Sequence, residues 1–184
     1  SPLDEYYSDI SKYFLKKENL FLVRGSENPI FEIITLFHLF LIYLKYKPEL
    51  VHHFTIKACL YGTIAAKFSN VFRVVNAVTG LGQVFLGQYF VNILLRKALK
   101  PIYKAVFNSR RSIVVFQNSD DQEKLIDLGI TKLKHSTLIK GSGVDINHFK
   151  PSKDVKRLSG KSVKLFFPSR LIKQKGILEL LLAF

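Results

Sequence analysis

The sequence predicts an α/β protein built on a doubly wound parallel sheet. Short runs rich in β-branched residues alternate with longer helical segments along the 184 residues. Two of these runs, 72–78 (FRVVNAV) and 112–117 (SIVVFQ), are apolar almost throughout, which is typical of parallel strands buried on both faces. The chain is 48% hydrophobic, with 16 Phe and 8 Tyr, so it can form a packed core. Its single cysteine, Cys59, excludes an internal disulfide.

The first part of the chain contains a strong helix start. Asn28 can cap free amide groups, and Pro29 fits a first helical turn. This helix is expected to run to Tyr46, before Pro48. It is apolar nearly all round, so it should be buried on more than one face. A membrane-touching helix is the alternative, since the apolar run 30–44 is shorter than the roughly 20 residues of a membrane span. Ahead of it we expect a helix at 4–16 and a short strand at 20–23.

The middle of the chain alternates between strand and helix patterns. Pro101 is expected to end or kink the long helical stretch there, because proline cannot donate the helical hydrogen bond. The expected elements are strand 50–54, helix 56–68, strand 72–78, loop 79–82 and helix 84–107.

The last part begins with strand 112–117. Ser119 is expected to cap the next helix, with Gln122 completing a capping box, and Gly129 to end it. Residues 138–139 and 163–167 are expected in strands. The polar stretch 147–161 is the best linker candidate.

In doubly wound parallel sheets, ligands bind beyond the carboxyl ends of the strands. His52 and His53 end one strand and face opposite sides, so they do not form a pair of metal ligands, and no metal site is expected. A packed or hydrogen-bonded histidine is the alternative to a functional one. Asp120 and Asp121 fit the start of a helix better than a catalytic pair.

Glycine-rich stretches do not complete a known nucleotide fingerprint. The dinucleotide pattern and the P-loop each require a further glycine at a fixed position. Those positions hold Phe85 after Gly80–Leu81–Gly82, Ile146 after Gly141–Ser142–Gly143, and Val155 before Gly160–Lys161–Ser162. We therefore expect neither an NAD site nor a P-loop.

A basic turn follows the predicted strand 163–167. Arg170 offers a fork of donors, and Lys175 adds a compact charge beside Gly176 at a helix start. Such a turn can hold a diphosphate and stabilise it as a leaving group. The alternative interpretation is a solvated basic turn.

The net charge is +14, which attracts polyanions, anionic membranes or phosphorylated small molecules. No helix-turn-helix, RNP or zinc pattern is present, so nucleic acid is not an expected partner. The helical stretch 84–107 carries four cations among apolar residues and could lie on anionic lipid, or it is a packed helix with a solvated basic face. These cations are Arg96, Lys97, Lys100 and Lys104.

Several spaced motifs resemble one known family. Gly141–Asp145 (GSGVD), Phe149–Lys150–Pro151, and Phe167–Leu171 (FPSRL) with Lys175–Gly176–Ile177 are similar to the middle of glycosyltransferase family 4. Upstream, "KPELVHHFTIKACLYGTIAA", "VVNAVTGLGQVF" and "VVFQNSDDQE" resemble a bacterial branch that builds surface glycans. The resemblance covers residues 24–184.

The resemblance implies a GT-B fold, in which two Rossmann-like domains face each other. The acceptor domain would be 1–143, followed by the linker 144–161 and the start of the nucleotide-sugar domain at 162–184. It implies a retaining hexosyltransferase that needs no metal or other cofactor. The donor would be a UDP-sugar, and the acceptor a lipid-linked or plain saccharide of lipopolysaccharide or capsule assembly. The enzyme would be cytoplasmic, peripheral on the inner face of the membrane.

The resemblance also assigns residues. Arg170 and Lys175 would bind the donor diphosphate, and Gly143 and Asp145 would lie at the interdomain crossing. The resemblance does not fix a group that assists proton transfer; if one does so, His53 is the candidate over His52. The acceptor-side residues would be His52, Thr55, Thr79, Gly80 and Gly82.

The chain departs from the family pattern at both ends. It lacks the first strand with its Gly-rich loop and the late Glu-x7-Glu pair, so we expect a piece truncated at both ends and inactive alone. The alternatives are a non-catalytic basic module that binds nucleic acid or membrane, and an inactive remnant.

Overall fold

The computed structural model describes residues 16, 18–21, 28–81, 85, 90–141, 143–150, 165–169, 171 and 175–183. The chain separates into two compact units, Ser1–Ser142 and Gly143–Phe184. Each unit is described by itself. The expected helix 4–16 lies outside the described residues except for Lys16, as do residues 22–23 of the first expected strand.

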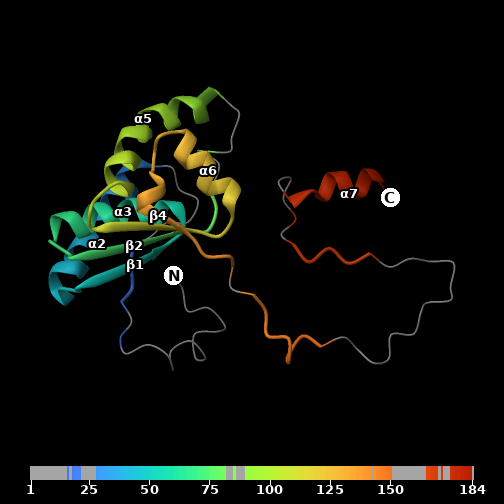
Figure 1. Cartoon of the computed structure of the whole chain (residues 1–184), viewed down its shortest axis with the longest axis horizontal. Helices are drawn as coiled ribbons and strands as arrows, with labels where there is room; N and C mark the ends of the chain where they lie inside the picture. Colours follow the sequence, from blue (N-terminus) through green and yellow to red (C-terminus); the bar gives the residue numbers. More distant parts are fainter. Residues whose placement is uncertain are drawn as a thin grey trace. The chain divides into compact units, whose positions relative to one another are not determined.

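The first unit is built on a four-stranded parallel sheet (Figure 1). Its strands pair in chain order, β1-β2-β3-β4, with His53 opposite Asn76 and Asn76 opposite Val114. The parallel α/β, Rossmann-like class predicted from the sequence is confirmed. The strands are β1 (Leu50–Phe54), β2 (Arg73–Val78), β3 (Ser112–Phe116) and β4 (Ser136–Leu138).

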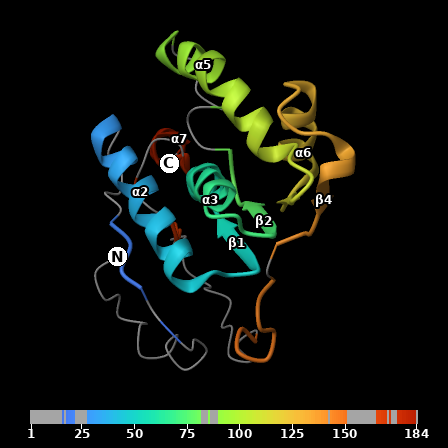
Figure 2. The same ribbon diagram turned by 90° about the vertical axis from the view of Figure 1, so that its left-hand side faces the viewer.

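Helices cover one face of this sheet. Parallel strands that pair in chain order are joined by crossovers of one hand, so their helices fall on the same side. Figure 1 shows α3, α5 and α6 on one side of the strands, and Figure 2 shows α2 alongside α3. The helices of the first unit are α2 (Pro29–Tyr46), α3 (Ile56–Phe68), α5 (Phe90–Phe107), α6 (Ser119–Asp127) and the short 3-10 helix η1 (Leu133–His135).

The core lies between the sheet and these helices. In β1 and β3 every second residue points toward the helices and is buried. One cluster centres on Phe107, Val114 and Phe116, which are fully buried. On the opposite face Leu50, Phe54 and Ile113 are exposed. The described residues therefore show one helix layer, and the predicted second layer is not seen among them.

The helix α2 has the predicted bounds but not the predicted burial. Asn28 Oδ1 accepts from Ile30 N at 3.0 Å, which confirms the predicted cap. Only Thr35 and Tyr43 of this helix are buried, so the expectation of burial on several faces is wrong: α2 packs on α3 and β1 along a single side. Among the described helices, α2 alone is long and apolar enough to cross a membrane, by length and composition.

The predicted boundaries of α3 and β1 match the structure, and two other predictions need correction. Helix α5 continues through Pro101, which lies exposed, so the expected end before Pro101 is wrong and the expected kink there stays a prediction. Helix α6 is capped by Asn118, whose Oδ1 accepts from Asp121 N at 2.8 Å, and not by Ser119. The predicted capping box is absent from the described contacts, because Gln122 donates to Ser136 Oγ instead. Gly129 ends α6 as predicted, with φ 64°.

The second unit contains one described helix, α7 (Ile177–Ala183). Residues 165–167 were expected in a strand, but they form unpaired chain and Phe166 is 88% exposed. A strand requires a hydrogen-bonded neighbour, and none lies among the described residues of this unit.

Candidate functional site

The candidate site lies at the carboxyl ends of the four parallel strands, where the sequence predicted it. Each strand there gives way to a polar loop. The backbone keeps the ends together: Thr55 N donates to Ala77 O at 3.1 Å, and Ile139 N donates to Phe116 O at 2.8 Å. The predicted acceptor-side residues Thr55, Thr79 and Gly80 therefore share one edge of the sheet.

Thr55 holds an unusual backbone conformation at this edge. Its φ of 77° and ψ of 148° lie in a region that is otherwise almost confined to glycine, and costs about 1–3 kcal/mol. Thr55 precedes α3, but its side chain makes no capping hydrogen bond. The first turn of α3 therefore presents backbone donors toward the carboxyl edge that the helix itself cannot satisfy.

The loop after β2 has a buried anchor. Thr79 is exposed and Gly80 half-buried, whereas Leu81 is 1% exposed and belongs to the core. A Cβ added at Gly80 would meet no atom within 4 Å, so the space beside this backbone is open. Gly82 lies outside the described residues.

His52 and His53 face opposite sides of β1, as predicted. His52 is exposed, whereas His53 is 7% exposed and faces the helix layer. The structure thus places the two side chains apart, with His53 in the interior instead of in an open pocket.

Both ring nitrogens of His53 have hydrogen-bond partners. The amide nitrogen of Asn76 lies 2.9 Å from Thr63 Oγ1 and 3.0 Å from Ser112 Oγ, so it donates to them. Asn76 Oδ1 is left to accept, and it lies 2.9 Å from His53 Nδ1. His53 Nε2 then accepts from the Tyr43 hydroxyl at 2.7 Å. This pattern fixes a neutral imidazole with its proton on Nδ1.

The electrostatics agree with a neutral His53. Burial, the largest cause, lowers the pKa of His53, and the hydrogen bond to Asn76 opposes this effect. Burial raises the pKa of Tyr43, so its hydroxyl stays a donor. A part in proton transfer remains a prediction for His53, whose lone pair on Nε2 is already taken by Tyr43.

A polar cluster that the sequence did not reveal lies at the same edge. Lys57, in the first turn of α3, forms an ion pair with Glu32 Oε1, in the first turn of α2. The other carboxylate oxygen, Glu32 Oε2, is buried without a hydrogen-bond partner among the described residues. Burial and the nearby Glu32 carboxylate raise the pKa of Tyr61. Glu32 and Lys57 lie 25 positions apart, so no local sequence pattern predicts their ion pair.

The predicted interdomain residues begin the second unit. Gly143 has φ 68°, in the left-handed region that favours glycine. Asp145 Oδ1 accepts from Asn147 N at 2.8 Å, which makes a tight turn. The boundary between the two units falls directly before Gly143.

Of the two predicted donor residues, Lys175 lies within the described part of the chain and Arg170 lies outside it. Lys175 is exposed and precedes Gly176, which has φ 79°. Donor binding by this pair therefore stays a prediction. Within the described part of the chain, no three His, Cys, Asp or Glu side chains gather as metal ligands would.

Comparison with known proteins gives two matches. A family model described as "Glycosyl transferase 4-like" matches residues 13–118, which is more than half of the chain. The chain is also 26% identical over 150 residues to a protein of Campylobacter jejuni subsp. jejuni, covering 82% of this chain and 39% of that protein. That protein is an N,N'-diacetylbacillosaminyl-diphospho-undecaprenol alpha-1,3-N-acetylgalactosaminyltransferase. The chain therefore spans about two fifths of the length of the curated relative it matches.

Proposed function

This chain belongs to the glycosyl transferase 4-like family, and we propose that the whole protein transfers a sugar from a UDP-sugar to a lipid-linked acceptor, with retention of configuration. The observation that carries the proposal is the family match over β1, β2 and β3, whose carboxyl ends form the candidate site. The relative acts on a diphospho-undecaprenol-linked sugar, which supports an acceptor of the same class in cell-surface glycan assembly. A plain saccharide acceptor is the alternative.

We assign acceptor binding to the carboxyl edge of the first unit. An acceptor sugar carries hydroxyl groups that require acceptors, and its diphosphate requires donors. The uncapped first turn of α3 supplies donors for the diphosphate, and the Glu32–Lys57 ion pair lies at the same edge. Thr55, Thr79 and Gly80 would then shape the wall of this site, with His52 at its edge and Gly82 in the same loop.

Thr55→Gly separates a binding role from a folding role. Glycine adopts the observed backbone angles without strain, so the variant is expected to fold with equal or higher stability. If Thr55 contacts the acceptor, the variant raises the KM for the lipid-linked acceptor severalfold and leaves the KM for the UDP-sugar unchanged. Unchanged acceptor kinetics would remove Thr55 from the site.

We assign donor binding to Arg170 and Lys175 in the second unit. An arginine fork and a lysine ammonium can hold the diphosphate and stabilise it as it leaves, without a metal ion. Gly143 and Asp145 would form the crossing between the acceptor and donor domains. Each charge removal, Arg170→Ala or Lys175→Ala, is expected to lower kcat/KM by about 10²-fold or more. Lys150→Ala is the matched control, because Lys150 is also an exposed lysine of the second unit.

We further propose that the enzyme is peripheral on the cytoplasmic face of the membrane. A lipid-linked acceptor keeps its prenyl chain in the bilayer, so the enzyme must approach that surface. The net charge of +14 and the exposed Lys97, Lys100 and Lys104 of α5 support attraction to anionic lipid.

The deciding experiment is an assay of the full-length protein with a panel of UDP-sugars and undecaprenyl-diphosphate-linked saccharides. Product with inverted anomeric configuration would contradict the retaining mechanism, and failure with every nucleotide-sugar would contradict the proposal. We expect the 184-residue chain alone to be inactive, because it spans about two fifths of the length of the relative that it matches. Turnover by this chain alone would overturn that expectation.

A further inference from the structure

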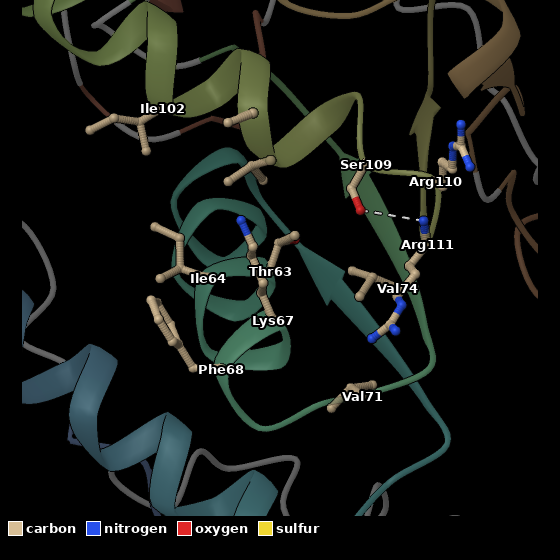
Figure 3. A pocket seen from close by; sticks show the side chains of 12 residues that line it. Thr63, Ile64, Lys67, Phe68, Val71, Val74, Ile102, Ser109, Arg110 and Arg111 are labelled. Carbon is tan, nitrogen blue, oxygen red and sulfur yellow. Dashed lines mark hydrogen bonds between the residues drawn. The ribbon is translucent and has the colours of Figure 1, made fainter.

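A cavity lies between α3 and α5, at the amino ends of β2 and β3 (Figure 3). Its volume is about 610 Å³, within the range of about 300–1,000 Å³ that is typical of small-molecule sites. The floor is apolar, and Figure 3 shows Ile64 of α3 and Ile102 of α5 on its two sides. The floor residues are Ile64, Phe68, Val71, Val74, Ile102 and Val106.

The rim of the cavity is cationic. Lys67 comes from the last turn of α3, and Arg110 and Arg111 lie directly before β3. Arg111 Nη1 donates to Asn70 Oδ1 at 3.0 Å, and all three cations belong to exposed residues. In the described part of the chain, no carboxylate forms an ion pair with any of them.

The negative ends of the neighbouring helix dipoles are too weak to balance the three cations of the rim. Both α3 and α5 end at this edge, and each carboxyl terminus carries about half a negative charge. The two helix ends together offset about one positive charge, so roughly two remain beside the apolar floor.

We infer that this cavity binds an anionic amphiphile, with its hydrocarbon chain on the apolar floor and its phosphate or carboxylate head at Lys67, Arg110 and Arg111. Each methylene group that leaves water improves binding about fourfold, so the chain dominates the affinity. A sugar or a nucleoside fits poorly, because the floor would leave its polar groups without partners. The chemistry is shared by anionic phospholipids and free fatty acids.

This site is distinct from the proposed acceptor site. The cavity lies at the amino ends of the strands, and the acceptor loops lie at their carboxyl ends, one strand length or about 20 Å away. The inference goes beyond sugar transfer, and it can be tested without donor or acceptor.

The test uses 11-(dansylamino)undecanoic acid, a fluorescent anionic amphiphile, with the 184-residue chain. We expect saturable binding with a fluorescence increase, displaced by oleate but not by acetate or inorganic phosphate at equal concentration. Displacement by phosphatidylglycerol vesicles, but not by phosphatidylcholine vesicles, would identify membrane lipid as the source. Displacement by oleate alone would identify free fatty acid. Equal displacement by inorganic phosphate would overturn the inference, because a simple anion site would then suffice.

Two variants and two controls locate the binding. Ala105 lines the cavity, so Ala105→Trp fills it while all three cations remain, and we expect at least tenfold weaker binding. Ala98→Trp on the same helix is its control, because Ala98 is exposed and does not line the cavity. The double variant Lys67→Ser/Arg110→Ser should also weaken binding tenfold or more. Its control, Lys132→Ser/Lys134→Ser, removes the same charge from exposed residues near η1.

The outcomes decide the inference. Undiminished binding to either cavity variant, with unfolding curves that show intact folding, would overturn it. An equal loss of amphiphile binding in the control variants would also overturn the inference. The amphiphile would then be attracted by the net charge or by exposed apolar surface, and not by the cavity.

Discussion

At the scale of single residues, the most informative feature is the buried hydrogen-bond chain through His53. It joins α2, β1, β2, α3 and β3 through five side chains: Tyr43, His53, Asn76, Thr63 and Ser112. Buried polar groups are expensive unless each is paired, so a chain of this kind favours one packing of the helices over others. The same network determines what His53 can do in the free protein.

Gly62 makes room for the His53 ring. A Cβ at position 62 would lie 2.2 Å from His53 Nε2, far inside contact distance. Gly62→Ala is therefore expected to lower the free energy of unfolding by about 1–3 kcal/mol, although alanine is the better helix former. Urea unfolding would measure this loss. Gly141→Ala is the control, since a Cβ there meets nothing within 4 Å, and equal effects of the two variants would contradict the argument.

The network also predicts a dependence of stability on pH. The pKa of His53 is lowered in the folded chain, so the unfolded chain binds a proton first as the pH falls. The stability contributed by neutral His53 is thus present above the unfolded pKa of about 6.5 and is lost below it, with a slope of at most about 1.4 kcal/mol per pH unit. Urea unfolding between pH 7.5 and 5 would measure the slope. The slope should flatten in His53→Gln and persist in the exposed control His52→Gln.

At the scale of elements, the sequence predicts periodicity better than it predicts caps. The bounds of α2, β1 and α3 follow from Asn28, Pro29 and the apolar spacing, and they match the structure. The cap of α6 was misplaced by one residue, because Asn118 and Ser119 are both good caps and only backbone geometry decides between them. The Glu32–Lys57 ion pair and the inward orientation of the His53 side chain depend on packing between segments that are distant in sequence. Local sequence patterns therefore could not predict them.

The cap of α6 can be tested directly. Asn118→Ala removes the bond to Asp121 N and is expected to lower the free energy of unfolding by about 1 kcal/mol. Ser119→Ala should change it by a few tenths at most, because Ser119 lies inside the helix. Chemical denaturation of both variants would show the difference. A larger loss of stability in Ser119→Ala than in Asn118→Ala would identify Ser119 as the cap.

Pro101 gives a second test at this scale. It lies exposed inside α5 and cannot donate a helical hydrogen bond, so the helix loses one bond there. Proline is about 3 kcal/mol less favourable than alanine in a helix interior. Pro101→Ala is therefore expected to raise the midpoint of thermal unfolding. An unchanged midpoint would show that α5 contributes little to the cooperative unit.

At the scale of the whole molecule, the stabilising core belongs to the first unit. Both clusters of buried residues lie within Ser1–Ser142, and no described residue of Gly143–Phe184 is buried. A chain shortened to residues 1–142 is expected to keep its urea midpoint within experimental error, measured by circular dichroism. A clearly lower midpoint would show that the second unit contributes to the stability of the first.

The identical order of strands in the chain and in the sheet has a consequence for biosynthesis. When each strand from β2 to β4 leaves the ribosome, the strand with which it pairs has already been synthesised. The sheet can therefore grow from β1 toward β4 in the order of translation, without waiting for a distant segment to insert between existing strands. Ribosome-bound chains stalled after β2 and after β3 should show stepwise protection of their amides, as expected for a fold assembled in the direction of synthesis.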